Sequence, residues 1–272
     1  MNDSDFKRVN GKFANVNGIK MYYEVYGDGY PLILIHGGIS SIQMWNKQIP
    51  VLSHHFKVIA VDCRGQGRTD NPTGEFHYKQ MADDFAAFIR ELKLDKVLLC
   101  GWSDGAQIGL EMGMHYPELI KAMVLGGTLL HVSQEMIDGF KAIGVNAPGE
   151  VDFEKLEKSL PWLVKLLKEH QSYVYGEDYW KTLLEKISIM WFDPDEFPGD
   201  KVKSIETPSL VLLGDRDDYI PISEAIKIHE LMPNTELAIL PNANHDAYDS
   251  YLNIFNQIVI NYLARHTKEK KG

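Results

Sequence analysis

Short apolar runs recur along the chain and alternate with longer segments in which apolar residues return every three or four positions. The runs are rich in valine, isoleucine and leucine, a composition typical of strands buried on both faces of a parallel sheet. We therefore predict strands over Pro31–Ile35, Lys57–Val61, Lys96–Cys100, Lys121–Leu125, Ser209–Leu213 and Glu236–Leu240.

The longer segments between these runs have the periodicity of amphipathic helices. Strands that alternate with helices in this way indicate a parallel α/β fold, in which the helices are the crossover connections. The helices that we predict are Tyr78–Leu92, Ala106–His115, Ser223–Met232 and Ala247–His266.

The segment Phe13–Tyr26 has a different pattern, in which polar and apolar residues alternate on both sides of Asn17-Gly18. Asn-Gly between two alternating runs is a strong signal for a tight turn of a β-hairpin. We expect this hairpin to form an antiparallel edge of an otherwise parallel sheet.

A stretch from about Ser133 to Asp200 interrupts the alternation, because it is helical in pattern and lacks any clear strand. Within it we predict helices over Asp152–His170, kinked or divided at Pro161, and over Glu177–Met190. The chain is thus expected to comprise a core domain, 1–132 and 201–272, and a helical cap, 133–200, inserted after the sixth strand. Three roles are open for the cap: a lid over the sheet edge, simple packing onto the core, or a lid that opens on membranes.

The composition is that of a soluble globular protein, with 44% hydrophobic and 24% charged residues among 272. The net charge of -10 argues against nucleic acid or an acidic membrane surface as a partner. Met1–Arg8 is polar and no run of eighteen apolar residues occurs, so neither a signal peptide nor a transmembrane helix is expected. With only two cysteines and no metal-type spacing, we expect a cytoplasmic, reduced protein, and a homo-oligomer is left open.

The pentapeptide Gly101-Trp102-Ser103-Asp104-Gly105 lies between a predicted strand and a predicted helix. A Gly-x-Ser-x-Gly turn in that setting strains the serine backbone and projects its hydroxyl at the carboxyl edge of the sheet. The glycines leave room for strand and helix to approach each other closely. This five-residue pattern also occurs by chance, so the other expected features must support it.

A second candidate feature, Leu34-Ile35-His36-Gly37-Gly38, follows another predicted strand. We expect an oxyanion hole here, formed by the backbone amides of Gly38 and Asp104, because two fixed amides stabilise the charge of a tetrahedral intermediate. Asp104 also begins a helix, where free amides and the helix dipole favour an anion. His36 is expected to pin the loop by hydrogen bonds.

A serine hydroxyl needs a histidine to accept its proton, and a carboxylate to orient that histidine. Among ten histidines, His245 follows the last predicted strand and should therefore lie on the same sheet edge as Ser103. Three aspartates, Asp215, Asp217 and Asp218, follow the strand before it, and their positions alone do not decide which of them faces the histidine.

These loops together resemble the α/β-hydrolase family over about Phe13–Arg265. The acid loop of that family commonly reads Gly-x-x-Asp with proline four places on, and Gly214 to Pro221 matches it at Asp217. The resemblance thus implies the triad Ser103, Asp217 and His245, in the order that the family uses. It also implies an α/β-hydrolase fold, with a mostly parallel central sheet and helices on both faces.

The elbow around Ser103 is similar to that of valacyclovirase-like enzymes, the biphenyl hydrolase-like esterases, a branch that hydrolyses amino-acid esters. That similarity raises the question whether Asp104 holds a substrate ammonium group or only caps a helix. Residues expected near the substrate are Trp45, Trp102 and His131, although His131 also fits an ordinary hydrogen-bonded histidine.

The expected activity is that of a serine esterase, which cleaves a carboxylic ester or lactone through an acyl-enzyme intermediate. The partner is then a small-molecule ester, and neither a metal nor an organic cofactor is required. Three alternatives remain: carbon-carbon bond hydrolysis of dienoic ketoacids, cofactor-free perhydrolysis, and a ligand-sensing protein with slow turnover.

Overall fold

The computed structural model describes residues 9–267, so the polar start of the chain and the basic tail at Lys268–Lys271 lie outside the described residues. Eight strands form one sheet: β1 (Lys12–Val16), β2 (Ile19–Tyr26), β3 (Pro31–Ile35), β4 (Lys57–Val61), β5 (Val97–Trp102), β6 (Ile120–Gly126), β9 (Ser209–Gly214) and β10 (Thr235–Leu240). Around it lie α1 (Ile49–Leu52), α2 (Tyr78–Glu91), α3 (Asp104–His115), α8 (Ile222–Leu231), α9 (Ala247–Ser250) and α10 (Leu252–Arg265), with short 3-10 helices at Ile42–Trp45 and Pro117–Leu119.

The sheet has the strand order β1-β2-β4-β3-β5-β6-β9-β10. Strand β2 pairs antiparallel with β1 and β4, whereas all other neighbouring strands are parallel. The expected hairpin edge and the mostly parallel sheet are therefore confirmed. All the predicted strands are present, with ends that differ by at most two residues.

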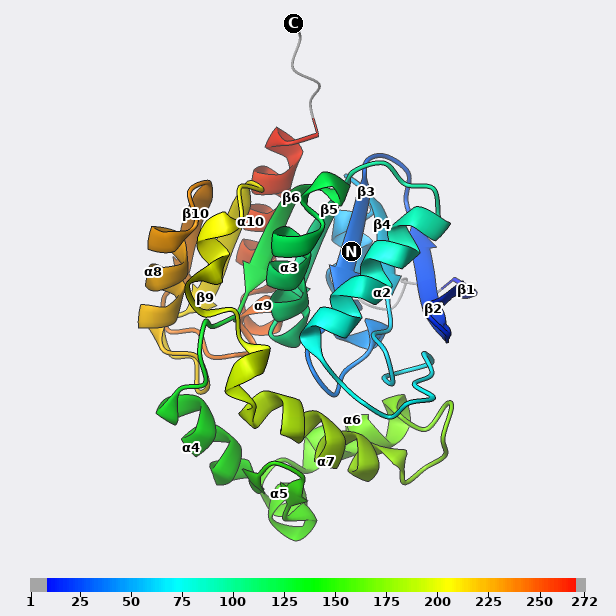
Figure 1. Cartoon of the computed structure of the whole chain (residues 1–272), viewed down its shortest axis with the longest axis vertical. Helices are drawn as coiled ribbons and strands as arrows, with labels where there is room; N and C mark the ends of the chain where they lie inside the picture. The colour runs from blue at the N-terminus through cyan, green and yellow to red at the C-terminus, as the bar shows by residue number, and fades with distance from the viewer. Residues whose placement is uncertain (1–8, 268–272) are drawn as a thin grey trace, which may run out of the picture.

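Helices cover both faces of the sheet, with α2 and α3 on one side of it and α10 on the other (Figure 1). Alternate residues of each central strand point to opposite sides: Leu32 and Leu34 join one buried cluster, and Ile33 and Ile35 join the other. Burial on both faces explains why the central strands are continuous apolar runs rather than alternating ones.

The segment between β6 and β9 adds no strand to the large sheet and lies beyond one end of it (Figure 1). It contains α4 (Gln134–Ile143), β7 (Val145–Ala147), β8 (Glu150–Val151), α5 (Phe153–Ser159), α6 (Pro161–His170), α7 (Tyr179–Phe192) and 3-10 helices at Pro194–Glu196 and Gly199–Ser204. We refer to residues 133–204 as the inserted segment. No helix within residues 9–267 combines the length and the apolar character that crossing a membrane would require.

Two local expectations were wrong. The inserted segment does contain strands, because β7 and β8 pair as a small hairpin whose turn includes Gly149, with φ +75°. The last helix is not continuous, because Tyr251 departs from helical geometry (φ -111°, ψ 36°) and separates α9 from α10. The expected break at Pro161 is present, between α5 and α6.

Helix α3 approaches the sheet closely along a row of glycines. A Cβ added at Gly101 would lie 2.2 Å from the carbonyl oxygen of Gly105, so the end of β5 and the start of α3 nearly touch. Further along α3, a Cβ at Gly109 would meet the side chain of Leu125 at 2.7 Å. The row therefore lets α3 pack directly onto the strands, which offsets the low helix propensity of glycine.

We predict that Gly101→Ala destabilises the protein by about 1–3 kcal/mol or more, because the new Cβ overlaps a backbone oxygen that cannot move alone. Gly113→Ala is the matched control, because its Cβ would meet side-chain methyl groups of Met123 and Ile205 at 2.9 and 3.0 Å rather than the backbone. Alanine gains about 1 kcal/mol of helix propensity there, so we expect a small net change. Urea unfolding of both variants tests this, and an equal or larger loss at Gly113 contradicts it.

Candidate active site

Ser103 occupies a sharp turn between β5 and α3. Its backbone has φ 54° and ψ -121°, a conformation that costs a non-glycine residue about 1–3 kcal/mol. The turn is held by the Ser103 amide, which donates to the carbonyl of Gly126 at 2.8 Å. A Cβ at Gly105 would lie 2.2 Å from the carbonyl oxygen of Ile35, so the turn is also packed against β3. This is the geometry that a nucleophilic serine requires.

The imidazole of His245 and the carboxylate of Asp217 form a hydrogen bond, with 2.8 Å between Nδ1 and Oδ2. The other oxygen of Asp217 accepts the backbone amides of Tyr219 and Ile220 at 3.0 and 2.9 Å. The Asp217 side chain is fully buried, so its orientation is fixed from both sides. Asp215 lies apart from the imidazole, with its carboxylate near the Ala243 amide at 3.4 Å.

Ser103 and His245 line the same cavity. The loop that carries His245 is tied to the residue before the serine, because the indole N–H of Trp102 donates to the His245 carbonyl at 3.0 Å. Within residues 9–267 the Ser103 hydroxyl forms no hydrogen bond to the imidazole. Catalytic hydrogen bonds of this kind are often long before substrate binds and tighten in the Michaelis complex.

Burial opposes protonation of His245, but the negative charge of Asp217 and its hydrogen bond to Nδ1 outweigh that effect. The negative charges of Asp104 and Asp218 also favour the protonated imidazole, so the pKa of His245 is raised above its usual value of 6.5. A raised pKa makes the imidazole a stronger base once it is neutral.

Gly38 and Asp104, whose amides are the expected oxyanion donors, both line the cavity with Ser103, and the side chain of Asp104 lies against Gly38. A Cβ at Gly38 would lie 2.3 Å from Oδ2 of Asp104, so only glycine fits there. His36 anchors the loop, because its Nδ1–H donates to the Gly37 carbonyl at 2.7 Å and its Nε2 accepts the Cys63 amide at 2.9 Å. Burial lowers the pKa of His36 to about 4, so the ring is neutral and suited to this pinning role.

The carboxylate of Asp104 is buried between two aromatic donors that the sequence did not reveal. Tyr78, at the start of α2, donates its hydroxyl to Oδ1 at 2.8 Å, and Trp191, in α7, donates its indole N–H to Oδ2 at 2.9 Å. Burial raises the pKa of Asp104 to about 6, although the bonds from Trp191 and Tyr78 and the charge of His245 act against it. Trp191 lies one residue beyond the predicted helix Glu177–Met190, within the last turn of α7, and no local signal connects it to the turn at Ser103.

The cavity has a volume of about 790 Å³, within the range for small-molecule sites. Its wall includes apolar side chains of the inserted segment, such as Phe140, Leu156 and Leu163. Trp102 lies at the wall but is almost fully buried. Among residues 9–267, no group of three or more histidine, cysteine, aspartate or glutamate side chains is arranged to hold a metal ion.

Two of the residues expected near the substrate are not at the cavity. Trp45 is fully buried beside Tyr248 and Phe255, because its ring fills the space between the sheet and α10. His131 is exposed and lies beside Gly199, outside the cavity wall. Both cysteines, Cys63 and Cys100, are buried free thiols.

Comparisons with known proteins agree with the fold. A family model described as alpha/beta hydrolase fold matches residues 30–178. The chain is 27% identical to the 2-hydroxy-6-oxo-6-(2'-aminophenyl)hexa-2,4-dienoic acid hydrolase of Metapseudomonas resinovorans, covering 93% of this chain and 91% of that protein. It is 26% identical to the human serine hydrolase BPHL, covering 91% and 84%. A solved meta-cleavage product hydrolase from Pseudomonas fluorescens IP01 superposes with a TM-score of 0.79 at 21% identity, covering 95% and 98%.

We predict that Asp217→Asn lowers kcat by about four orders of magnitude. The asparagine oxygen can keep the bonds from Tyr219 and Ile220, but its NH₂ would then donate to Nδ1 of His245 and select the wrong tautomer. Asp215→Asn is the matched control in the same loop and should keep kcat near wild type. Hydrolysis of p-nitrophenyl acetate by both folded variants measures this, and equal losses would refute the assignment.

A pH profile tests the charge coupling between Asp104 and His245. The negative charge of Asp104 helps to raise the pKa of His245, so Asp104→Asn should move the acid limb of kcat/KM to lower pH. Asp215→Asn, which does not contribute to that shift, should leave the limb in place. An acid limb that stays unchanged or moves to higher pH in Asp104→Asn would show that the two groups are not coupled in this way.

Proposed function

Because the chain belongs to the alpha/beta hydrolase fold family, we propose that it cleaves a carboxylic ester or lactone through an acyl-enzyme intermediate on Ser103. The observation that carries this proposal is the arrangement at the sheet edge. A serine in a strained turn shares one cavity with an imidazole that is hydrogen-bonded to a buried carboxylate. These are the components of nucleophilic catalysis by an activated serine.

In the proposed reaction, His245 takes the proton of Ser103 as the hydroxyl oxygen attacks the substrate carbonyl. The amides of Gly38 and Asp104 stabilise the resulting oxyanion. The carbon-oxygen bond to the alcohol then breaks, and the alcohol leaves with the proton from His245. Water repeats the cycle on the acyl-enzyme, releasing the acid and restoring Ser103, while Asp217 holds the imidazole in one tautomer.

We further propose that residues 133–200 act as a cap over this site. The support is that α4, α5, α6 and α7 each contribute side chains to the wall of the cavity that Ser103 lines. The acyl or alcohol part of the substrate would thus lie against apolar groups such as Phe140, Leu163 and Trp191, which exclude water from the acyl-enzyme.

The charge of the cavity favours a neutral or cationic substrate. Its wall includes four carboxylates, Asp104, Asp218, Asp246 and Asp249. Among the described residues no arginine lines it, and the lysine that does, Lys47, is paired with Asp249 at 2.8 Å. The charges of Lys47 and Asp249 offset each other, so an anionic substrate would meet the carboxylate of Asp104, which directly follows Ser103, without a compensating cation among the described residues.

The second candidate is carbon-carbon bond hydrolysis on the same residues. Its support is the 27% identity, over most of both chains, to a hydrolase that is named for a dienoic acid. That acid carries a carboxylate, for which the cavity offers little positive charge. We therefore rank ester cleavage first.

Labelling and a substrate panel test the proposal together. We expect a fluorophosphonate probe to label Ser103 alone, and Ser103→Ala to lose both labelling and p-nitrophenyl ester turnover. The panel compares simple esters, lactones, amino-acid esters with their N-acetylated forms, dienoic ketoacids, and peroxide with acetate. We expect neutral esters or free amino-acid esters to give the highest kcat/KM.

Each outcome of the panel has a distinct meaning. Labelling at another residue, or full turnover by Ser103→Ala, would refute the nucleophile. Labelling of Ser103 with turnover only of dienoic ketoacids would establish the second candidate. Stoichiometric binding without repeated turnover would indicate a ligand sensor. A preference for free over N-acetylated amino-acid esters that Asp104→Asn abolishes would identify Asp104 as an ammonium site.

A further inference from the structure

The loop that carries Gly38 is fixed at its two ends by the core of the protein. At the start, His36 bonds to Gly37 and Cys63, as described above. At the end, the Ile42 amide donates to Oδ1 of Asp62 at 2.7 Å. Among the described residues, the carbonyls of Ile39 and Ser40, which lie between these anchors, accept hydrogen bonds from one side chain alone.

That side chain is Gln171, which directly follows α6 in the inserted segment. Its Nε2 donates to the carbonyls of Ile39 and Ser40 at 3.2 and 2.7 Å, and its Oε1 accepts the Gly67 amide at 2.8 Å. The residue is 1% exposed. Only a carboxamide satisfies this set, because two acceptors and one donor face it at the same time.

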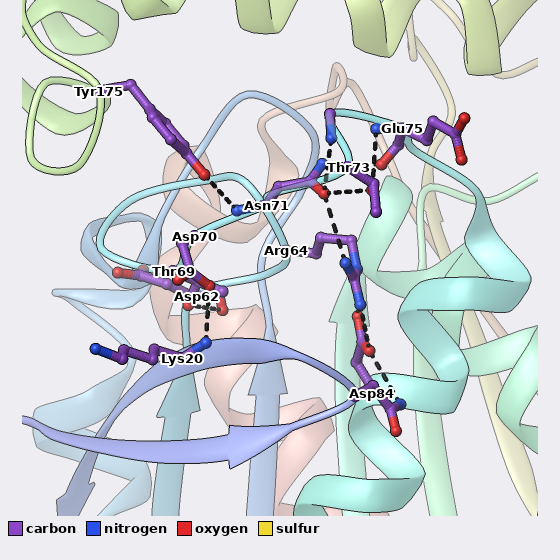
Figure 2. Close-up of polar contacts among 12 residues, drawn as sticks. Lys20, Asp62, Arg64, Thr69, Asp70, Asn71, Thr73, Glu75, Asp84 and Tyr175 are labelled. Atoms are coloured by element: carbon purple, nitrogen blue, oxygen red, sulfur yellow. Dashed lines mark hydrogen bonds and ion pairs between the residues drawn. The ribbon is translucent and has the colours of Figure 1, made fainter.

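The partner, Gly67, lies in the loop after β4, which hydrogen bonds and an ion pair hold to the core. Figure 2 shows how the loop after β4 is held: the guanidinium of Arg64 binds Asp84 through two bonds of 2.7 and 2.8 Å, and Asp70 accepts the Lys20 amide at 2.7 Å. Tyr175 of the inserted segment reaches the same loop and accepts the Asn71 amide at 2.7 Å (Figure 2). Gln171 therefore connects the Gly38 loop to a fixed support.

The backbone next to Gly38 needs such support. Ile39 has φ 53°, a left-handed conformation that is unfavourable for a β-branched residue. Strain of this kind persists only where surrounding contacts determine the conformation. The Ile39 carbonyl bonded by Gln171 belongs to the strained residue itself, so this contact acts directly on the chain that sets the direction of the Gly38 amide.

We propose that Gln171 is a positioning residue for the oxyanion hole, through which the inserted segment holds the Gly38 amide in its catalytic orientation. This inference rests on the proposed function, because it needs Gly38 to bind an oxyanion. Without the carboxamide, Ile39 relaxes toward an ordinary conformation and the Gly38 amide turns away from the reacting carbonyl.

The test uses Gln171→Met, which keeps the size of the side chain, and Gln171→Glu, which keeps an acceptor for Gly67 but loses the donor. Tyr175→Phe is the matched control, because it removes another contact between the inserted segment and the same core loop, away from Gly38. Active sites are counted by fluorophosphonate titration, so that kcat refers to folded enzyme only.

We expect kcat to fall about 10- to 100-fold in both Gln171 variants while KM stays the same, since loss of a whole oxyanion donor costs about 100- to 1000-fold. Affinity for a trifluoromethyl ketone, whose adduct with Ser103 carries an oxyanion, should fall by the same factor. Tyr175→Phe should keep both values near wild type. A purely structural role would lower the titrated fraction and the melting temperature without this parallel loss.

Several outcomes would overturn the inference while leaving the proposed function intact. Three of them are kinetic: an unchanged kcat in folded Gln171 variants, a change in KM alone, or an equal loss of kcat in Tyr175→Phe. The fourth is a failure of both Gln171 variants to fold, which would show that Gln171 is needed for folding rather than for positioning Gly38. If the wild-type protein is not labelled at Ser103, the proposed function fails before this question arises.

Discussion

The structure depends on a steric constraint where β5 meets α3. Strand, helix and the end of β3 approach so closely that Cβ atoms at Gly101 and Gly105 would each lie 2.2 Å from a backbone oxygen. Ser103 lies in the turn between these glycines with a positive φ. The close packing of β5, α3 and β3 thus fixes the hydroxyl of Ser103 at the edge of the cavity.

Buried negative charge is the second constraint on the site. Asp104 combines a backbone amide at the start of α3 with a carboxylate that is held by Tyr78 and Trp191. Charge buried in a low dielectric acts strongly on its neighbours, and it raises the pKa of His245 together with Asp217. Asp104 therefore influences the oxyanion hole, the base and the charge of the cavity. The same carboxylate thus affects both the acid limb of the kcat/KM profile and the preference for substrate charge.

Local patterns were sufficient for most of the fold. The ends of β3 and β4 coincide with their apolar runs, and the break between α5 and α6 follows from Pro161. The pairing of Asp217 with His245 was expected from family resemblance, and the short distance between them agrees with it. By contrast, the position of Trp45 shortly after the Gly37-Gly38 loop predicts a residue at the entrance to the site, whereas its ring is buried in the core.

The contacts that escaped prediction join residues far apart in the chain. Trp191 lies 87 positions from Asp104, and Gln171 lies 132 positions from Ile39. An amphipathic pattern indicates which face of a helix is buried, but it does not indicate which loop that face will meet. A glutamine just after the end of a helix is an ordinary surface residue in most sequences. The residue type at position 171 therefore does not predict a buried role. Its role follows only from the three backbone groups that converge on it, and those groups are brought together by the docking of the inserted segment onto the strained loop at Ile39.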